Sequence, residues 1–311
     1  MKKEIFVAID GSIYSNQALS YITTLFKDQE DIYFHLCTMV TAATSVMPSV
    51  ADSKNSLMPD AGGGAQAKKE ATAKRFLHKA SEKLIQAGIA PERIKTDIQI
   101  SGYNIAGTIQ HTAAKDLMDS ILVGRQGLNA ISEMLMGSVS ATLFKKCHNT
   151  PLWIIDGKVT SKGFLVPVDG SPNSLMAIDH LCHILQNRQD IHICLFHCTS
   201  LFAKKPQCDL HLFHHKWDKD WCKEYLSDGD CLFNGPRQLL LEAGIPGSQV
   251  QILPEVSGLE ESKGIVREAK KQNCGTIVMG RRTAGMAKGL FGGVSDRAIK
   301  KVQDMAIWIV G

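Results

Sequence analysis

Residues 6–12 read Phe-Val-Ala-Ile-Asp-Gly-Ser, and residues 165–171 repeat the pattern as Leu-Val-Pro-Val-Asp-Gly-Ser. Each copy is a short apolar run that ends in a polar turn. Later in each copy a second match follows, Gly124-Arg125 with Gly280-Arg281. A period of about half the chain indicates duplicated domains and not a solenoid. We therefore predict a first domain at 1–157 and a second at 162–311, joined through the polar stretch around 156–163.

The composition is that of an ordinary globular protein and excludes several classes of partner. The chain of 311 residues carries 35 Lys and Arg against 31 Asp and Glu, a net charge of +4. This balance supplies no large basic field for nucleic acid. No run approaches the roughly 18–20 apolar residues of a membrane helix, and Asp10 ends the first apolar run before it reaches signal-peptide length. We expect neither nucleic-acid binding nor membrane insertion.

Cysteine usage favours the cytoplasm. The nine cysteines include no Cys-x-x-Cys pair, and seven fall after residue 150. This pattern is not a disulfide framework and suits a reducing compartment.

Within each copy, short apolar runs rich in β-formers alternate with helical patterns, which predicts an α/β fold with a parallel sheet flanked by helices. The strongest helix covers about 67–88, where apolar residues keep the spacing of one buried face and Gly88 provides a left-handed cap. The predicted strands of the first copy are 5–10, 32–38, 96–101, 119–124 and 150–155. Each copy is thus a five-stranded, Rossmann-like domain.

The carboxyl ends of the first and fourth strands carry the candidate ligand site. In an open parallel sheet, ligands bind where the strand order reverses, which here selects Asp10 and Gly124. From Gly124 the sequence reads Gly-x2-Gly-x9-Gly-Ser. Gly124 and Gly127 would let the backbone turn and approach a ligand, and Gly137-Ser138 opens a helix whose free N–H groups attract an anion. The alternative is a tight turn followed by an ordinary serine cap.

These motifs resemble the universal stress protein family over nearly the whole chain, as a tandem pair. The resemblance implies an adenine nucleotide alpha hydrolase-like fold that binds ATP or AMP, with or without Mg²⁺. It also implies a role in stress survival or signalling, and an intramolecular pseudo-dimer that acts alone or pairs into a homodimer. Carried over by position, the implied nucleotide contacts are Asp10, Met39, Gly124, Arg125, Gly127, Gly137, Ser138, Val139 and Ser140. For Asp10, an ordinary Asp-Gly turn or helix cap is the alternative.

The second copy departs from this motif. Thr283 replaces the second glycine and Gly293 replaces the phosphate-side serine. Because a β-branched residue tolerates positive φ poorly, we predict that the second site is weakened, altered or empty. Its candidate residues are Asp169, Cys198, Gly280 and Ser295.

A segment rich in Cys, His and Trp around 199–231 has no counterpart in the first copy. Between 197 and 231 lie four cysteines and four histidines, which could bind zinc. Their spacings are not those of familiar zinc sites, so the prediction is no metal, with a structural insertion or a partner surface in its place.

We expect a nucleotide-binding regulatory protein in which occupancy changes the loops at 39–66 and 125–137, and hence what the surface offers an unknown protein partner. The alternatives are a weak ATPase or self-phosphorylating enzyme, and an interaction scaffold that binds no nucleotide. The sequence places no catalytic base, nucleophile and metal-ligand set, which favours binding over catalysis.

Overall fold

The computed structural model describes residues 1–42, 61–102, 104–128, 136–200, 208–227, 230–281 and 293–311. The first half of the chain alternates strands and helices as the sequence predicts. Its elements are β1 (Lys3–Ala8), α1 (Ile13–Phe26), β2 (Ile32–Thr41), α2 (Ala61–Gln86), β3 (Ile94–Ser101), α3 (Ile105–Lys115), β4 (Ser120–Gly124), α4 (Ser138–Lys146) and β5 (Leu152–Ile155).

The second half repeats the order with additions. Its elements are β6 (Gly163–Pro167), α5 (Pro172–Leu185), β7 (His192–Phe196), β8 (Cys198–Ser200), α6 (Lys219–Leu226), α7 (Cys231–Glu242), β9 (Val250–Ile252), β10 (Val256–Gly258), α8 (Glu261–Lys271), β11 (Thr276–Gly280), α9 (Val294–Lys301) and β12 (Ala306–Val310). All five predicted strands and the long helix of the first copy are confirmed, with ends shifted by a few residues.

Local sequence explains these elements. Successive side chains of a strand point to opposite faces, so Ile5 and Val7 enter one core while Phe6 enters the other. The helix α2 buries Ala73, Leu77, Ala80 and Leu84 along one stripe. It ends before Gly88, whose φ of +99° confirms the predicted left-handed cap.

The two five-stranded sheets join into one sheet of ten strands. Its order is β3-β2-β1-β4-β5-β12-β11-β6-β7-β9. All neighbours are parallel except β5 and β12, which pair antiparallel at the centre with Trp308 opposite Trp153. The two indole rings stack with centroids 3.9 Å apart and planes 4° apart. The halves are therefore related by an approximate twofold at this pair.

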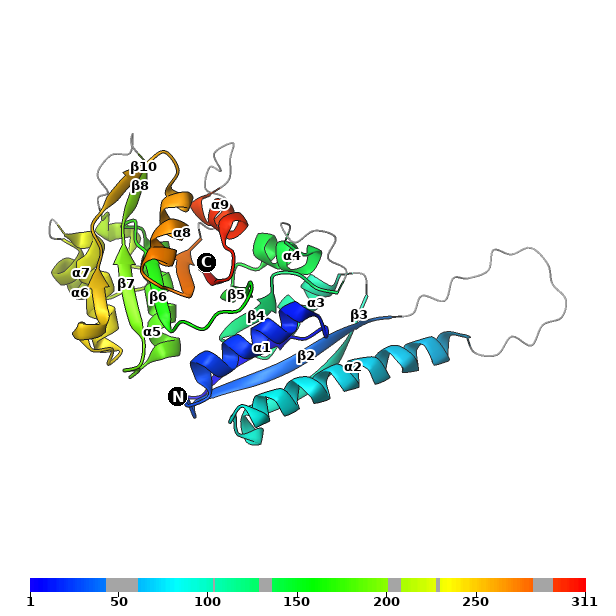
Figure 1. Ribbon diagram of the computed structural model, residues 1–311. Helices are drawn as coiled ribbons and strands as arrows, with labels where there is room; N and C mark the ends of the chain where they lie inside the picture. Colours follow the sequence, from blue (N-terminus) through cyan, green and yellow to red (C-terminus); the bar gives the residue numbers. More distant parts are fainter. Residues whose placement is uncertain (43–60, 103, 129–135, 201–207, 228–229, 282–292) are drawn as a thin grey trace, which may run out of the picture.

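Helices cover both faces of the sheet (Figure 1). One core lies under α1, α2, α5 and α7, and the other lies under α3, α4, α8 and α9. Each core contains residues from both halves. The molecule is thus a three-layer α/β/α structure whose layers run through the junction. Among the described residues, no helix is both long enough and apolar enough to cross a membrane.

The second half breaks two strands that are continuous in the first. The short strands β8 and β10 form a separate parallel pair instead of extending β7 and β9. Pro254 lies between β9 and β10, and a proline cannot donate to a strand ladder. Pro254 thus accounts for the break between β9 and β10.

A disulfide joins Cys208 to Cys231, a single pair that the cysteine spacing did not indicate. The stretch 208–227 packs Phe213, Cys222 and Leu226 into a small core against α5, and Cys231 is the first residue of α7. The bond therefore fastens a small segment to the main fold. Pairing cannot be deduced from cysteine spacing, and with this bond present the cysteine argument for a reducing compartment loses its support.

Candidate ligand-binding site

The site lies at the carboxyl ends of β1 and β4, which are parallel neighbours. From β1 the chain passes to β2 on one side, whereas β4 lies on the other side. The strand order reverses between these two strands, as at the ligand sites of open α/β sheets. The loop after β1 carries Asp10, and β4 ends at Gly124 and is followed by a loop that contains Arg125 to Leu128.

Asp10 ties the two loops together. One carboxylate oxygen, Oδ1, accepts the backbone N–H of Ser12 at 3.0 Å and the hydroxyl of Ser15 at 2.6 Å. The other, Oδ2, accepts the N–H of Leu128 at 3.1 Å. Gly11, between Asp10 and Ser12 in the chain, has a φ of +78°, a backbone region that glycine enters without strain. Asp10 thus forms the turn that the alternative interpretation described, and it also holds the β4 loop in place.

Close packing within the protein explains two glycines of the motif. A Cβ on Gly124 would lie 2.7 Å from Tyr14 Cβ and 2.9 Å from the Tyr14 carbonyl carbon, on the backbone of α1. A Cβ on Gly127 would lie 2.6 Å from Asp10 Oδ2. From the sequence alone, both glycines are expected to let the backbone approach a ligand. In the structure, Gly124 permits α1 to lie against β4, and Gly127 leaves room for Asp10.

The start of α4 offers backbone donors that the helix itself does not use. Gly137 is the N-cap of the helix and donates its own N–H to Arg125 O at 2.9 Å. Ser140 is buried, and its hydroxyl also donates to Arg125 O, at 2.6 Å. The N–H groups of the first helical turn have no partner within the helix, and Ser138 is exposed there. Ser138 and the backbone of Val139 are therefore the donors best placed for an anion, while Ser140 holds the loop.

The side chain of Arg125 points away from this helix start. It is 4% exposed, and its Nη1 donates to Asp156 Oδ2 at 3.0 Å and to Val302 O in the second half. Burial raises the pKa of Asp156 although Arg125 lies beside it. Only the backbone of Arg125 faces the site, through its carbonyl. A contact between this residue and a ligand stays a prediction.

Met39 lies on β2, opposite Gln99 of β3, and it is partly buried beside the α3–α4 core. Its neighbour Thr38 donates its hydroxyl to Ile9 O at 2.8 Å, which links β2 to the turn at Asp10. No described contact joins Met39 itself to Asp10 or α4. The loop residues 43–60 and 129–135, to which the sequence assigns a conformational change, lie outside the described residues.

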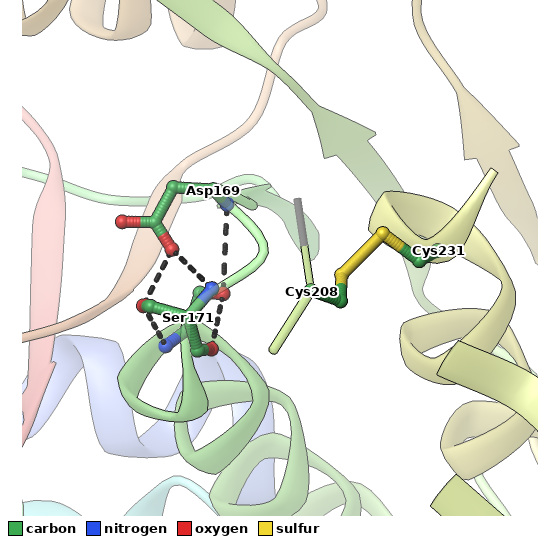
Figure 2. Close-up of a disulfide and its surroundings, with 5 residues drawn as sticks. Asp169, Ser171, Cys208 and Cys231 are labelled. Atoms are coloured by element: carbon green, nitrogen blue, oxygen red, sulfur yellow. Dashed lines mark hydrogen bonds between the residues drawn. A yellow bond between two sulfur atoms is a disulfide. The ribbon is translucent and has the colours of Figure 1, made fainter. Parts of the chain in front are cut away.

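The second half reproduces the turn but not the helix start. Asp169 Oδ1 accepts the N–H of Ser171 at 3.0 Å and its hydroxyl at 2.6 Å, in the surroundings of the disulfide (Figure 2). Gly280 packs on α5 as Gly124 packs on α1, since its Cβ would lie 2.1 Å from Asn173 O. Thr283 and the rest of 282–292 lie outside the described residues.

An acidic side chain occupies the start of α9. Asp296 Oδ2 accepts the N–H of Gly293 at 2.9 Å, and Ser295 beside it is buried. This carboxylate satisfies one donor and places a negative charge at the positive end of the helix dipole. Sequence reasoning did not single out Asp296, although an acidic residue three positions after Gly293 is a capping pattern.

Cys198 and its neighbour His197 lie where the first half has Met39 and Thr38. His197 Nδ1 lies 2.6 Å from Val168 O and so replaces the bond of Thr38 to Ile9. Cys198 is partly buried, and its sulfur would lie 2.7 Å from a Cβ on Gly264 of α8. In the part of the chain that the structure describes, no group of three or more His, Cys, Asp or Glu residues could hold a metal ion.

Comparison with known proteins supplies the family context. Residues 1–155 match the Universal stress protein family. A universal stress protein from Archaeoglobus fulgidus DSM 4304 has a TM-score of 0.64 at 16% identity, over 99% of this chain and 97% of that chain. A protein from Pseudomonas aeruginosa UCBPP-PA14, described as a candidate universal stress protein, has a TM-score of 0.52 at 14% identity, over 99% and 93%. These similarities establish the fold.

A third similar structure is a universal stress protein in complex with cAMP. It covers 49% of this chain and 96% of that chain at 20% identity, with a TM-score of 0.34, and nothing about the ligand of this chain follows from it. Among curated proteins, none matches the sequence.

Proposed function

We propose that this chain, whose residues 1–155 match the Universal stress protein family, is a tandem universal stress protein whose first half binds ATP or AMP. The observation that carries the proposal is the start of α4. There the exposed Ser138 and the N–H groups of the first turn, which have no partner within the helix, adjoin the loop that Asp10 holds. Such a helix start is a favourable site for a phosphate.

In this proposal the phosphates contact Ser138 and the backbone of Val139, and the nucleoside lies toward Asp10 and the end of β2 at Met39. Both oxygens of Asp10 already accept protein donors. We therefore expect the phosphates of the nucleotide to be the main ligands of any Mg²⁺. Occupancy then changes what the surface around the β4–α4 loop offers a protein partner.

The second half contributes a weaker site or none. Asp296 already satisfies Gly293 N–H at the start of α9, and its charge opposes that of a phosphate. At about 4 Å and an effective dielectric constant near 20, two like charges repel by about 4 kcal/mol. We therefore expect one nucleotide for each chain.

A charge substitution tests the site. Ser138→Asp places a carboxylate among the donors of the first turn and should weaken ATP binding more than tenfold in calorimetric titration, by the same repulsion. Gln86→Glu adds one negative charge at the exposed end of α2 and is the matched control, with unchanged affinity expected. Equal affinity in Ser138→Asp and wild type would refute the site.

The same preparations distinguish binding from catalysis. Mass spectrometry of small molecules released from the purified chain identifies a bound nucleotide. Incubation with ATP and Mg²⁺, followed by measurement of ADP and phosphate, detects turnover. Turnover that Asp10→Ala abolishes would favour the ATPase alternative over a binding protein.

A further inference from the structure

Two arginines occupy equivalent places in the halves, and each reaches across the junction. Arg125 follows the last residue of β4, and Arg281 follows the last residue of β11. Their backbone N–H groups bond to the last strand of their own half, Arg125 to Ile155 O at 2.8 Å and Arg281 to Val310 O at 2.7 Å. Both side chains are buried, with 4% and 7% exposed.

The guanidinium of Arg281 holds the end of α4. Nη1 donates to Phe144 O in the last turn, and Nη2 donates to Cys147 O at the C-cap. The guanidinium also lies 5.4 Å from the centroid of the Phe144 ring. The last carbonyls of a helix lack partners within it and carry the negative end of its dipole, so a buried cation with two donors fits them well.

Arg125 makes the reciprocal contact. Its guanidinium donates to Val302 O, the C-cap of α9, and Nη2 lies 3.5 Å from Lys300 O. Each arginine thus holds the end of the other half's helix. The start of α9 is occupied by its own Asp296, whereas α4 is the helix at which the phosphates are proposed to bind.

Both ends of α4 are therefore fixed by arginines. At the start, Arg125 O accepts Gly137 N–H and the Ser140 hydroxyl. At the end, the two donors come from the second half. A helix of nine residues is only about 13 Å long, so a change in position at one end moves the donors at the other.

We propose that Arg281 is a positioning residue for the phosphate site of the first half. The second half then serves as a support for that site, whatever it binds itself. This inference rests on the proposed function, because it assigns a role to α4 in nucleotide binding. It assigns no contact between Arg281 and the ligand.

The test compares ATP with adenosine in the full chain. Arg281→Ala should weaken ATP binding at least fivefold and leave adenosine binding within twofold, because adenosine has no phosphate for α4 to bind. Arg281→Lys keeps the charge but has a single donor group. Its affinity for ATP should lie between those of wild type and Arg281→Ala. A loss of affinity that is equal for ATP and adenosine would overturn the inference, since it would report general damage.

Arg188→Ala is the matched control. Arg188 is equally buried, and its Nη1 donates across the junction to Leu25 O near the end of α1, at 2.7 Å. Its loss weakens the junction without touching α4, so the ratio of ATP to adenosine affinity should stay at the wild-type value. The same change of ratio in Arg188→Ala as in Arg281→Ala would overturn the role specific to Arg281.

Hydrogen exchange separates this inference from the proposed function, because it needs no ligand. Amides of α4 should exchange at least tenfold faster in Arg281→Ala than in wild type, and Arg188→Ala should leave them unchanged. Failure of wild type to bind both ATP and AMP would refute the proposed function, and with it the positioning role. Unchanged exchange in Arg281→Ala, or ATP binding equal to wild type, would refute the positioning role alone.

Discussion

Acidification below pH 6.5 should weaken the contact between the halves, because a histidine there is held neutral. His180 lies on α5 in the second half and is buried. Its Nε2 accepts the indole N–H of Trp153, from the first half, at 3.2 Å, and the Ser120 hydroxyl lies 3.3 Å from the same atom. If the His180 ring were protonated, its Nε2–H would face the indole N–H of Trp153, and neither group could accept a hydrogen bond from the other.

The size and sign of the effect follow from proton linkage. Burial lowers the pKa of His180 to about 3, His183 adds to the shift and Asp119 opposes it. The unfolded chain takes up the proton near pH 6.5, while the folded chain does not. The free energy of unfolding that the neutral His180 contributes is therefore present above pH 6.5 and is lost as the pH falls below it. From pH 7.5 to 5.5 the loss is about 1.4 kcal/mol, and any folded-state pKa below about 4.5 gives nearly the same figure.

Urea unfolding at pH 7.5 and 5.5, followed by tryptophan fluorescence, measures this loss. Burial also lowers the pKa of His35, so wild type is compared with a variant that lacks only His180. His180→Gln keeps an acceptor for Trp153 but does not ionise, and the difference between the two losses of unfolding free energy isolates the effect of His180. Wild type should lose about 1.4 kcal/mol more than the variant. The exposed His78→Gln should behave as wild type. Equal losses in wild type and His180→Gln would refute the reasoning.

Three further substitutions, the first with a control variant, test the packing and the second site. Gly124→Ala should destabilise the chain by about 1–3 kcal/mol through its contact with the Tyr14 backbone, measured by thermal unfolding. Gly102→Ala, where a Cβ meets nothing within 4 Å, should cost far less. Trp308→Ala should lower the free energy of unfolding by about 3–5 kcal/mol, because it removes one ring of the central stack. Urea unfolding measures this change, and a loss below about 1 kcal/mol would contradict the prediction. Asp296→Ala should free the start of α9 and raise the number of ATP molecules bound from about one to two per chain in calorimetry; an unchanged stoichiometry argues against Asp296 as the block.

Much of the fold could be predicted because it depends on local patterns. The alternation of apolar runs with helical stripes predicts the strands of the first copy and the helix ending before Gly88, and the structure confirms them. The order of residues around Asp10 and Gly124 likewise predicts that both loops meet at one edge of the sheet. They do meet, through Asp10 and Leu128 N–H.

The direction of individual side chains could not be predicted. Arg125 stands in the loop beside the candidate site, yet its guanidinium lies in the junction between the halves. Ser140 bonds to Arg125 O and is not open to solvent. Loop sequence gives the order of residues but not the direction of each side chain, because residues distant in the sequence supply the partners toward which each side chain points.

The sequence by itself determined that the chain holds two related α/β units and that Gly293 stands in the second where the first has Ser138. Only the tertiary structure decided that β5 and β12 join both units into one sheet, that Arg125 and Arg281 each hold the other half's helix, and that Cys208 bonds to Cys231. Periodicity and turn chemistry act over a few residues, so they can be read along the chain. The contacts of Arg125 and Arg281 between the halves join residues more than a hundred positions apart, and no local pattern records them.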